Sequence, residues 1–176
     1  IIDDEICRKA AKEEIIRRYF RYKEEFLKGI QEKRTIERME ELMKKVKSKE
    51  TDRKVVPATR KAAEEARKQP GKGNKGIFSG AAIELPDGRI VTGKNSPLLH
   101  AESAAVLNAI KILAGIPDEI PLLSKEVIQN INVLKTNIMG GKSESLNLDE
   151  TLVALSISLI TNPTVCQALK KLKDLE

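Results

Sequence analysis

The sequence predicts an α+β protein that is mostly helical, with one antiparallel hairpin packed against helices and preceded by a helical connector. Apolar residues recur at spacings of three and four along most of the chain, which is typical of amphipathic helices. One segment instead alternates around Pro86-Asp87-Gly88, which indicates two strands joined by a turn. A lone hairpin is only marginally stable in water. We therefore expect helices to cover it, or strands from elsewhere to extend it.

The first half of the chain predicts three helices. Residues 3–28 form the first, with a stripe of Ile15, Tyr19 and Tyr22 and a stop at Gly29. The second covers about residues 35–46. The third begins with Pro57 in its first turn and ends before Pro70.

Composition divides the chain into residues 1–68, a helical connector, residues 69–76, a Gly/Lys loop, and residues 77–176, a hairpin-plus-helices domain. In that last domain the predicted strands are residues 77–85 and 89–92. The predicted helices are residues 98–114, 124–135 and 147–161, followed by a terminal helix from 162. The chain begins at Ile rather than Met, so we expect it to be a fragment of a longer protein.

Charge and composition narrow the classes of function. Residues 1–75 carry 23 Lys and Arg against 15 Asp and Glu, but the acids are interspersed, which favours solvated helix faces. Aromatic residues make up 3% of the chain, too few for a surface that stacks nucleic-acid bases. No apolar run is long enough to span a membrane. Cys7 and Cys166 lack paired spacing, which predicts free thiols and a cytoplasmic location.

A strand-to-helix junction carries the first candidate chemistry. His100 and Glu102 begin the helix that follows the hairpin, and this arrangement is similar to that of cytidine-deaminase-like proteins. There, a His and two Cys hold zinc while a Glu moves protons. No Cys pair follows His100 here, so the sequence supports no metal set. His100 and Glu102 remain candidate catalytic residues, and the alternative is a structural role for His100 at the helix start.

Two loops carry the second candidate chemistry. PGKGNKG can converge backbone N–H groups on an anion, with Lys72 and Lys75 adding charge. It is not a Walker loop, because a strand follows it. Lys94, Asn95 and Ser96 lie between strand and helix, where ligands commonly bind. For each loop the alternative is an ordinary linker or turn, and Gly140–Ser143 has the same ambiguity.

Three long segments identify a family resemblance. They are IIDDEICRKAAKEEIIRRYF, the run from DRKVVPATRKAAEEARKQ through GKNSPLLHAESAAVLNAIK, and SLNLDETLVALSISLITNP. With these segments the chain resembles the C-terminal part of an uncharacterised prokaryotic family, catalogued as a domain of unknown function. Some members carry the label ATP-dependent peptidase, although no protease constellation is found here. The resemblance implies an N-terminal portion like a nucleotide-type α/β domain, and it brings no catalytic residues or cofactor.

We therefore expect a structural, ligand-completing domain whose polar cleft, lined by Lys72, Lys75, Lys94, Asn95, Ser96 and His100, binds a phosphate-bearing small molecule. The first alternative is a metal-dependent deaminase or hydrolase using His100 and Glu102. The second is an oligomerisation module that buries the tyrosine stripe of the first helix. The expected partners are the remaining N-terminal domain and further copies of the chain. No nucleic acid or membrane partner is expected, and the cofactor is unknown.

Overall fold

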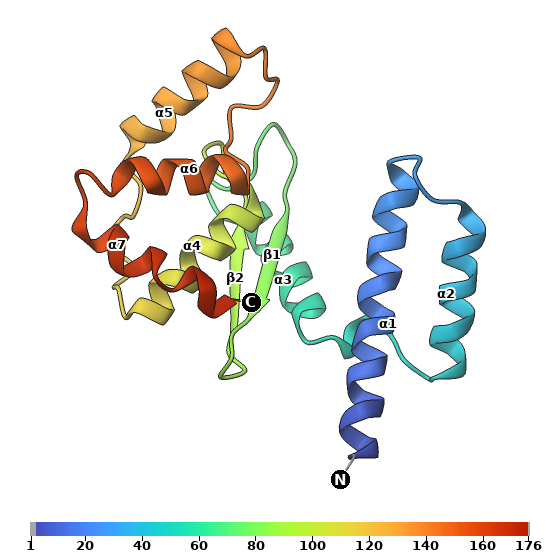
Figure 1. The fold of residues 1–176 in the computed structure, drawn as a ribbon. Coiled ribbons are helices and arrows are strands. Elements are labelled where there is room, and N and C mark those ends of the chain that lie inside the picture. Colours follow the sequence, from blue (N-terminus) through green and yellow to red (C-terminus); the bar gives the residue numbers. More distant parts are fainter. Residues whose placement is uncertain (1–2, 176) are drawn as a thin grey trace. The chain divides into compact units, whose positions relative to one another are not determined.

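The computed structural model describes residues 3–175, which gather into two compact units that divide between Val56 and Pro57. The fold is mostly helical with one two-stranded antiparallel sheet, as the sequence predicts (Figure 1). The division lies earlier than the Gly/Lys loop. From Pro57 onward, the third helix groups with the second unit.

The first unit is a helical hairpin. Helix α1 covers Asp4–Leu27 and α2 covers Lys33–Lys45, and a short 3₁₀ helix, η1, follows at Glu50–Asp52. The N-cap Asp3 accepts hydrogen bonds from two backbone N–H groups of the first turn of α1. The core of this unit consists of Ile16, Tyr19, Ile36 and Met43, flanked by Ile15 and Tyr22. The predicted stripe thus packs against α2 within the chain.

The second unit places the hairpin between two helices (Figure 1). Strand β1, Gly80–Glu84, pairs antiparallel with β2, Ile90–Lys94. Helix α4, Ala101–Ala114, packs along both strands on one side, and α3, Val55–Lys68, approaches the sheet from the other side at Gly80.

Two glycines allow these helices to approach the sheet closely. A Cβ at Gly80 would collide with the backbone of α3 at Thr59, and one at Gly93 would collide with the backbone of α4 at Ala101 and Ala105. Any side chain at these positions would push the layers apart. The two glycines therefore set the spacing of the three layers.

The remaining helical elements follow α4 in the chain and pack on it or on one another. They are α5, Lys125–Val133, the π-helical turn η2, Leu134–Ile138, α6, Leu148–Ser158, α7, Pro163–Leu169, and the 3₁₀ turn η3, Leu172–Leu175. Their main core joins α4, α6 and α7 through Leu107, Ile110, Leu155 and Val165. The capping box predicted at Asn147 and Glu150 is confirmed, with both reciprocal hydrogen bonds at 2.9 Å.

Two predicted boundaries differ from the structure for a physical reason. Residues 77–79 do not join the β1–β2 ladder, because Ile77 turns back to form a bridge with Asn74. Helix α4 begins at Ala101 and not at residue 98, because Leu99 forms a bridge with Leu146 and the backbone of Leu98 and His100 hydrogen-bonds to Leu146. Both departures shape the pocket described next.

Candidate functional site

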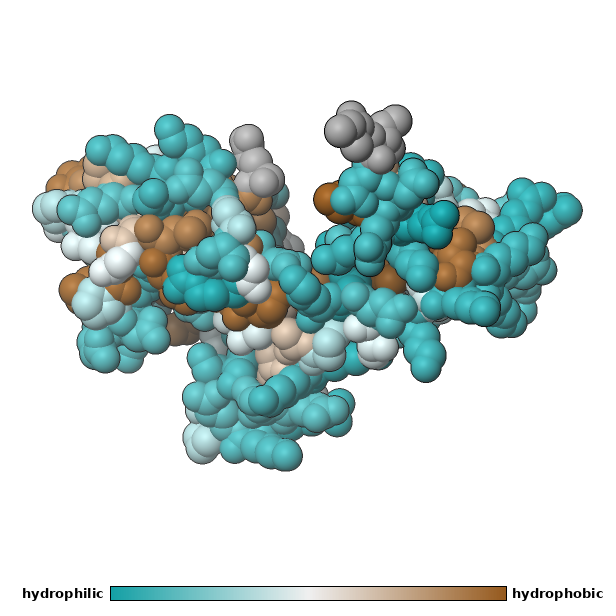
Figure 2. All heavy atoms as spheres, turned by 90° about the horizontal axis from the view of Figure 1, so that it is seen from below, coloured by the Kyte–Doolittle hydropathy of each residue, from teal (hydrophilic) through white to brown (hydrophobic). Residues whose placement is uncertain are grey.

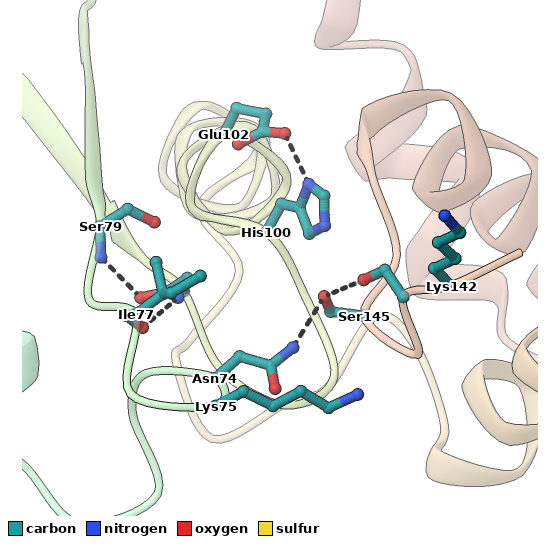
Figure 3. A pocket seen from close by; sticks show the side chains of 10 residues that line it. Asn74, Lys75, Ile77, Ser79, His100, Glu102, Lys142 and Ser145 are labelled. Carbon is teal, nitrogen blue, oxygen red and sulfur yellow. Dashed lines mark hydrogen bonds and ion pairs between the residues drawn. The ribbon is translucent and has the colours of Figure 1, made fainter.

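A pocket of about 380 Å³ opens in the second unit where three segments meet (Figure 3). The segments are the Gly/Lys loop with the residues leading into β1, the start of α4, and the loop before α6. Nine of its ten lining residues have polar side chains; the full set is Asn74, Lys75, Ile77, Ser79, Asn95, His100, Glu102, Lys142, Ser143 and Ser145.

The Gly/Lys loop presents Lys75 at the tip of a tight turn. Asn74 and Ile77 exchange two backbone hydrogen bonds of 2.9 Å around Lys75 and Gly76. Both central residues have positive φ, +49° at Lys75 and +79° at Gly76, as a type I′ turn requires. Asn, Asp or Gly is the usual occupant of the first central position. Lysine there has a conformational cost of roughly 1–2 kcal/mol.

Asn95 holds this loop against the end of β2. Its carboxamide oxygen accepts a hydrogen bond from the backbone N–H of Ser79 at 2.8 Å, and its NH₂ donates to the carbonyl of Ile77 at 2.9 Å. Its own backbone carbonyl accepts from Gly73 at 2.8 Å. Asn95 is buried, and its amide is engaged on both sides. It therefore positions the pocket wall.

Leu146 fixes the third wall beside the start of α4. This fully buried residue donates its backbone N–H to the carbonyl of Leu98, and its carbonyl accepts from the backbone N–H of His100, each at 2.9 Å. The buried hydroxyl of Ser103 donates to the same carbonyl at 3.2 Å. These bonds place Lys142, at the other end of the loop, on the pocket.

Ser145 connects two walls through its side chain. Its hydroxyl oxygen accepts a hydrogen bond from the Asn74 amide at 3.2 Å and lies 3.0 Å from the hydroxyl of Ser143 (Figure 3). Behind it, Lys135 on η2 donates to the carbonyl of Ser145 at 3.0 Å and to Glu150 at 2.8 Å. The pocket floor is thus anchored to α6.

The Glu150 carboxylate is ionised at neutral pH in this setting. Burial raises the pKa of Glu150, but hydrogen bonds from Lys135 and from the backbone N–H of Asn147 outweigh it, so the net effect lowers that pKa. The anchor therefore holds as an ion pair.

His100 occupies the N-cap position of α4, yet its ring does not cap the helix. Its Nδ1 atom instead lies 3.1 Å from Oε1 of Glu102 (Figure 3). The rest of the ring faces the pocket, and the backbone is held by Leu146. The ring is therefore oriented by a carboxylate and not used to satisfy the helix start.

Two lysines give the pocket its positive charge. Lys75 and Lys142 reach it from opposite loops, and both are exposed (Figure 3). Within residues 3–175 neither ammonium group has a hydrogen-bond or ion-pair partner. Both groups are available to a ligand.

The structure separates the remaining predicted site residues from this pocket. Lys94 pairs with Glu65 of α3 at 2.8 Å, and its ammonium lowers the pKa of that carboxyl. Lys94 and Lys72 line a different polar hollow of about 490 Å³. The Ser96 hydroxyl accepts hydrogen bonds from the backbone N–H groups of Leu98 and Leu99, as in an ordinary turn.

Within the described residues, the structure brings no set of metal ligands together around His100. Across residues 3–175 no three His, Cys, Asp or Glu side chains gather in a metal-binding arrangement. Cys166 is exposed on α7. In the same residues no helix is long and apolar enough to cross a membrane.

Sequence reasoning missed the contributions of Asn74, Ser79 and Ser145, and noted Lys142 and Ser143 only for loop composition. The Gly and Ser content around residue 140 was the feature of the sequence that could have indicated a contribution of this loop to a binding site. What brings this loop to His100 is a pairing of residues 98–100 with Leu146, between segments far apart in the chain.

The fold and the pocket define a mostly helical α+β domain with a polar ligand pocket at a strand-to-helix junction. The profile described as "Domain of unknown function DUF1846, C-terminal" matches residues 51–176, and its N-terminal counterpart matches residues 1–47. The chain belongs to this family. The boundary between the two profiles lies close to the division between the two units.

Relatives are found in several bacteria. The chain is 42% identical over 172 residues to a UPF0371 protein of Clostridium tetani, and 43% identical over 176 residues to one of Corynebacterium aurimucosum. It is 42% identical over 178 residues to one of Fusobacterium nucleatum. These alignments cover 98–100% of this chain but only 33–35% of each relative, so the chain spans about a third of their length.

Proposed function

We propose that this chain is a ligand-completing part of a larger protein, and that its pocket binds the phosphate group of a small molecule. The observation that carries the proposal is the pair of partnerless lysines, Lys75 and Lys142, on opposite walls of one polar pocket. A phosphate dianion between them would pair with both charges.

The position of Lys75 adds to this proposal. A lysine in a left-handed turn position costs stability that Asn or Gly would not. Side chains kept in unfavourable backbone conformations cluster at functional sites. The turn points the Lys75 ammonium at the pocket, which gives a reason for lysine at this position.

The start of α4 also favours the binding of a phosphate group. The N-terminus of a helix carries partial positive charge, and α4 begins at the pocket without a side-chain cap from His100. The hydroxyls of Ser143 and Ser145 and the amide of Asn74 supply neutral hydrogen-bonding groups. Such a mixture of charge and donors suits a phosphate ester better than a carboxylate alone.

The proposal also covers the partners of this chain and its location in the cell. Because the relatives are about three times longer than this chain, their remaining length would complete the ligand site and be the chain's principal partner. Further copies of the chain would be the second partner. A cytoplasmic location fits the two unpaired cysteines.

Lys75→Asn is the sharpest test, because it removes the charge from a position where Asn is the better turn residue. We expect inorganic phosphate to bind at least about tenfold more weakly, since one charged contact is lost. The melting temperature should stay the same or rise. Calorimetric titration and thermal unfolding measure the two effects.

Lys72→Gln is the matched control, because Lys72 lies in the same loop but on the other hollow. It should leave phosphate affinity unchanged, whereas Lys142→Gln should weaken it as Lys75→Asn does. Equal phosphate affinity in the Lys75→Asn variant and the parent protein would disprove the proposal.

A further inference from the structure

The His100–Glu102 pair carries more information than the positive charge of the pocket. The two side chains start one helix, and Nδ1 of His100 is 3.1 Å from Oε1 of Glu102. An ionised carboxylate can only accept a hydrogen bond, so Nδ1 must be the nitrogen that carries the proton. In the neutral ring, Nε2 is then left with a lone pair and no proton.

That lone pair faces the pocket. Figure 3 shows the ring of His100 projecting from the start of α4 with Nδ1 turned to Glu102 and its other edge toward the Ser145 wall. Within residues 3–175 no donor hydrogen-bonds to Nε2. The pocket therefore contains one good acceptor beside the two ammonium groups.

An acceptor and two cations select for different parts of a ligand. A phosphate oxygen is itself an acceptor and would be repelled by the Nε2 lone pair, so it belongs with Lys75 and Lys142. A hydroxyl group on the same ligand can donate to Nε2. We infer that the ligand is a phosphorylated alcohol that keeps at least one free hydroxyl, and that Nε2 of His100, oriented by Glu102, recognises this hydroxyl. This inference rests on the proposed function.

Charged groups from two helices and two loops lie near His100. Glu102 comes from α4 and Glu150 from α6, while Lys75 and Lys142 come from the two loops. Glu102 acts here as a positioning residue, because it sets which ring nitrogen faces the ligand.

Matched ligands separate the inference from the proposed function. Propyl phosphate carries the phosphate without a free hydroxyl, and glycerol 3-phosphate and glycerol 2-phosphate add hydroxyls at two positions. At pH 8 at least one glycerol phosphate should bind the protein about threefold to tenfold more tightly than propyl phosphate, which is the range of one hydrogen bond. Calorimetric titration gives the affinities.

Two variants assign the effect to the histidine. His100→Phe should abolish the preference for glycerol phosphates over propyl phosphate, because the acceptor for the ligand hydroxyl is lost. Glu102→Gln should reduce the preference without abolishing it, since an amide also permits the other ring tautomer. If propyl phosphate and both glycerol phosphates bind equally tightly, the inference is overturned although the proposed function stands. If none of the three binds, the proposed function itself fails.

Discussion

Glu150 shows how one side chain connects several parts of the site. Its carboxylate accepts hydrogen bonds from the backbone N–H of Asn147 and from the ammonium of Lys135. Lys135 in turn donates to the carbonyl of Ser145 on the pocket floor. A change at Glu150 should therefore affect the stability of α6 and the order of the pocket loop together.

Acid stability provides a measurement of this residue. The folded-state pKa of Glu150 is below its ordinary value of 4.5, because hydrogen bonds outweigh burial. It therefore contributes stability above pH 4.5, and that contribution is lost as the pH falls from 4.5 through the folded-state pKa. Glu150→Gln should cost about 1 kcal/mol at pH 7. It should also lose less stability than the parent on acidification.

Urea unfolding at pH 7 and pH 3 checks this prediction. Glu144→Gln, an exposed residue of the same loop, is the control and should follow the parent at both pH values. A Glu150→Gln variant with the same acid sensitivity as the parent would contradict the role assigned to the carboxylate.

At the scale of elements, the hairpin depends on the close approach of α4 to β2. The backbone of Ala101 and Ala105 occupies the space where a Cβ of Gly93 would lie. Buried Ala105 and Ala109 continue the small-residue face of α4 against the sheet. The position of the His100 ring thus depends on a contact between two backbones.

Gly93→Ala should destabilise the protein by about 2–3 kcal/mol, because overpacking moves α4 away from the sheet. It should also weaken phosphate binding, since the start of α4, with its partial positive charge, moves with the helix. Gly88→Ala is the control. Gly88 has φ +82° with open space around it, so its cost is conformational, about 1 kcal/mol, and remote from the pocket. Unfolding curves that rank the two variants equally would show that the contact does not limit stability.

Most elements could be predicted from the sequence, because their signals are local. The Asn147 and Glu150 capping box, Pro57 in a first turn and Gly29 after α1 each act within a few residues. The short extended segment before α4 could not be predicted, since its hydrogen bonds go to Leu146, which is distant in sequence.

At the scale of the whole molecule, the two units have separate cores. Ile16 is fully buried between α1 and α2, whereas Leu155 is fully buried among α4, α6 and α7. Each unit should therefore open independently on the timescale of hydrogen exchange.

Ile16→Ala tests this independence. The cavity should cost about 2–5 kcal/mol within the first unit. Amide exchange should accelerate throughout α1 and α2, while β1, β2 and α4 keep the parent's rates, as mass spectrometry with deuterium labelling would measure. Faster exchange in β2 or α4 would mean that the two units unfold together.

The sequence by itself determined the mostly helical α+β class, the turn at Pro86–Gly88, and the family, because composition, spacing and local capping are readable without the fold. It also singled out Lys75, Asn95 and His100. Only the tertiary structure decided that Lys142 and Ser145 share a pocket with them, while Lys72, Lys94 and Ser96 do not. The physical reason is that hydrogen bonds of Asn95 and Leu146, made across long sequence separations, determine which loops meet.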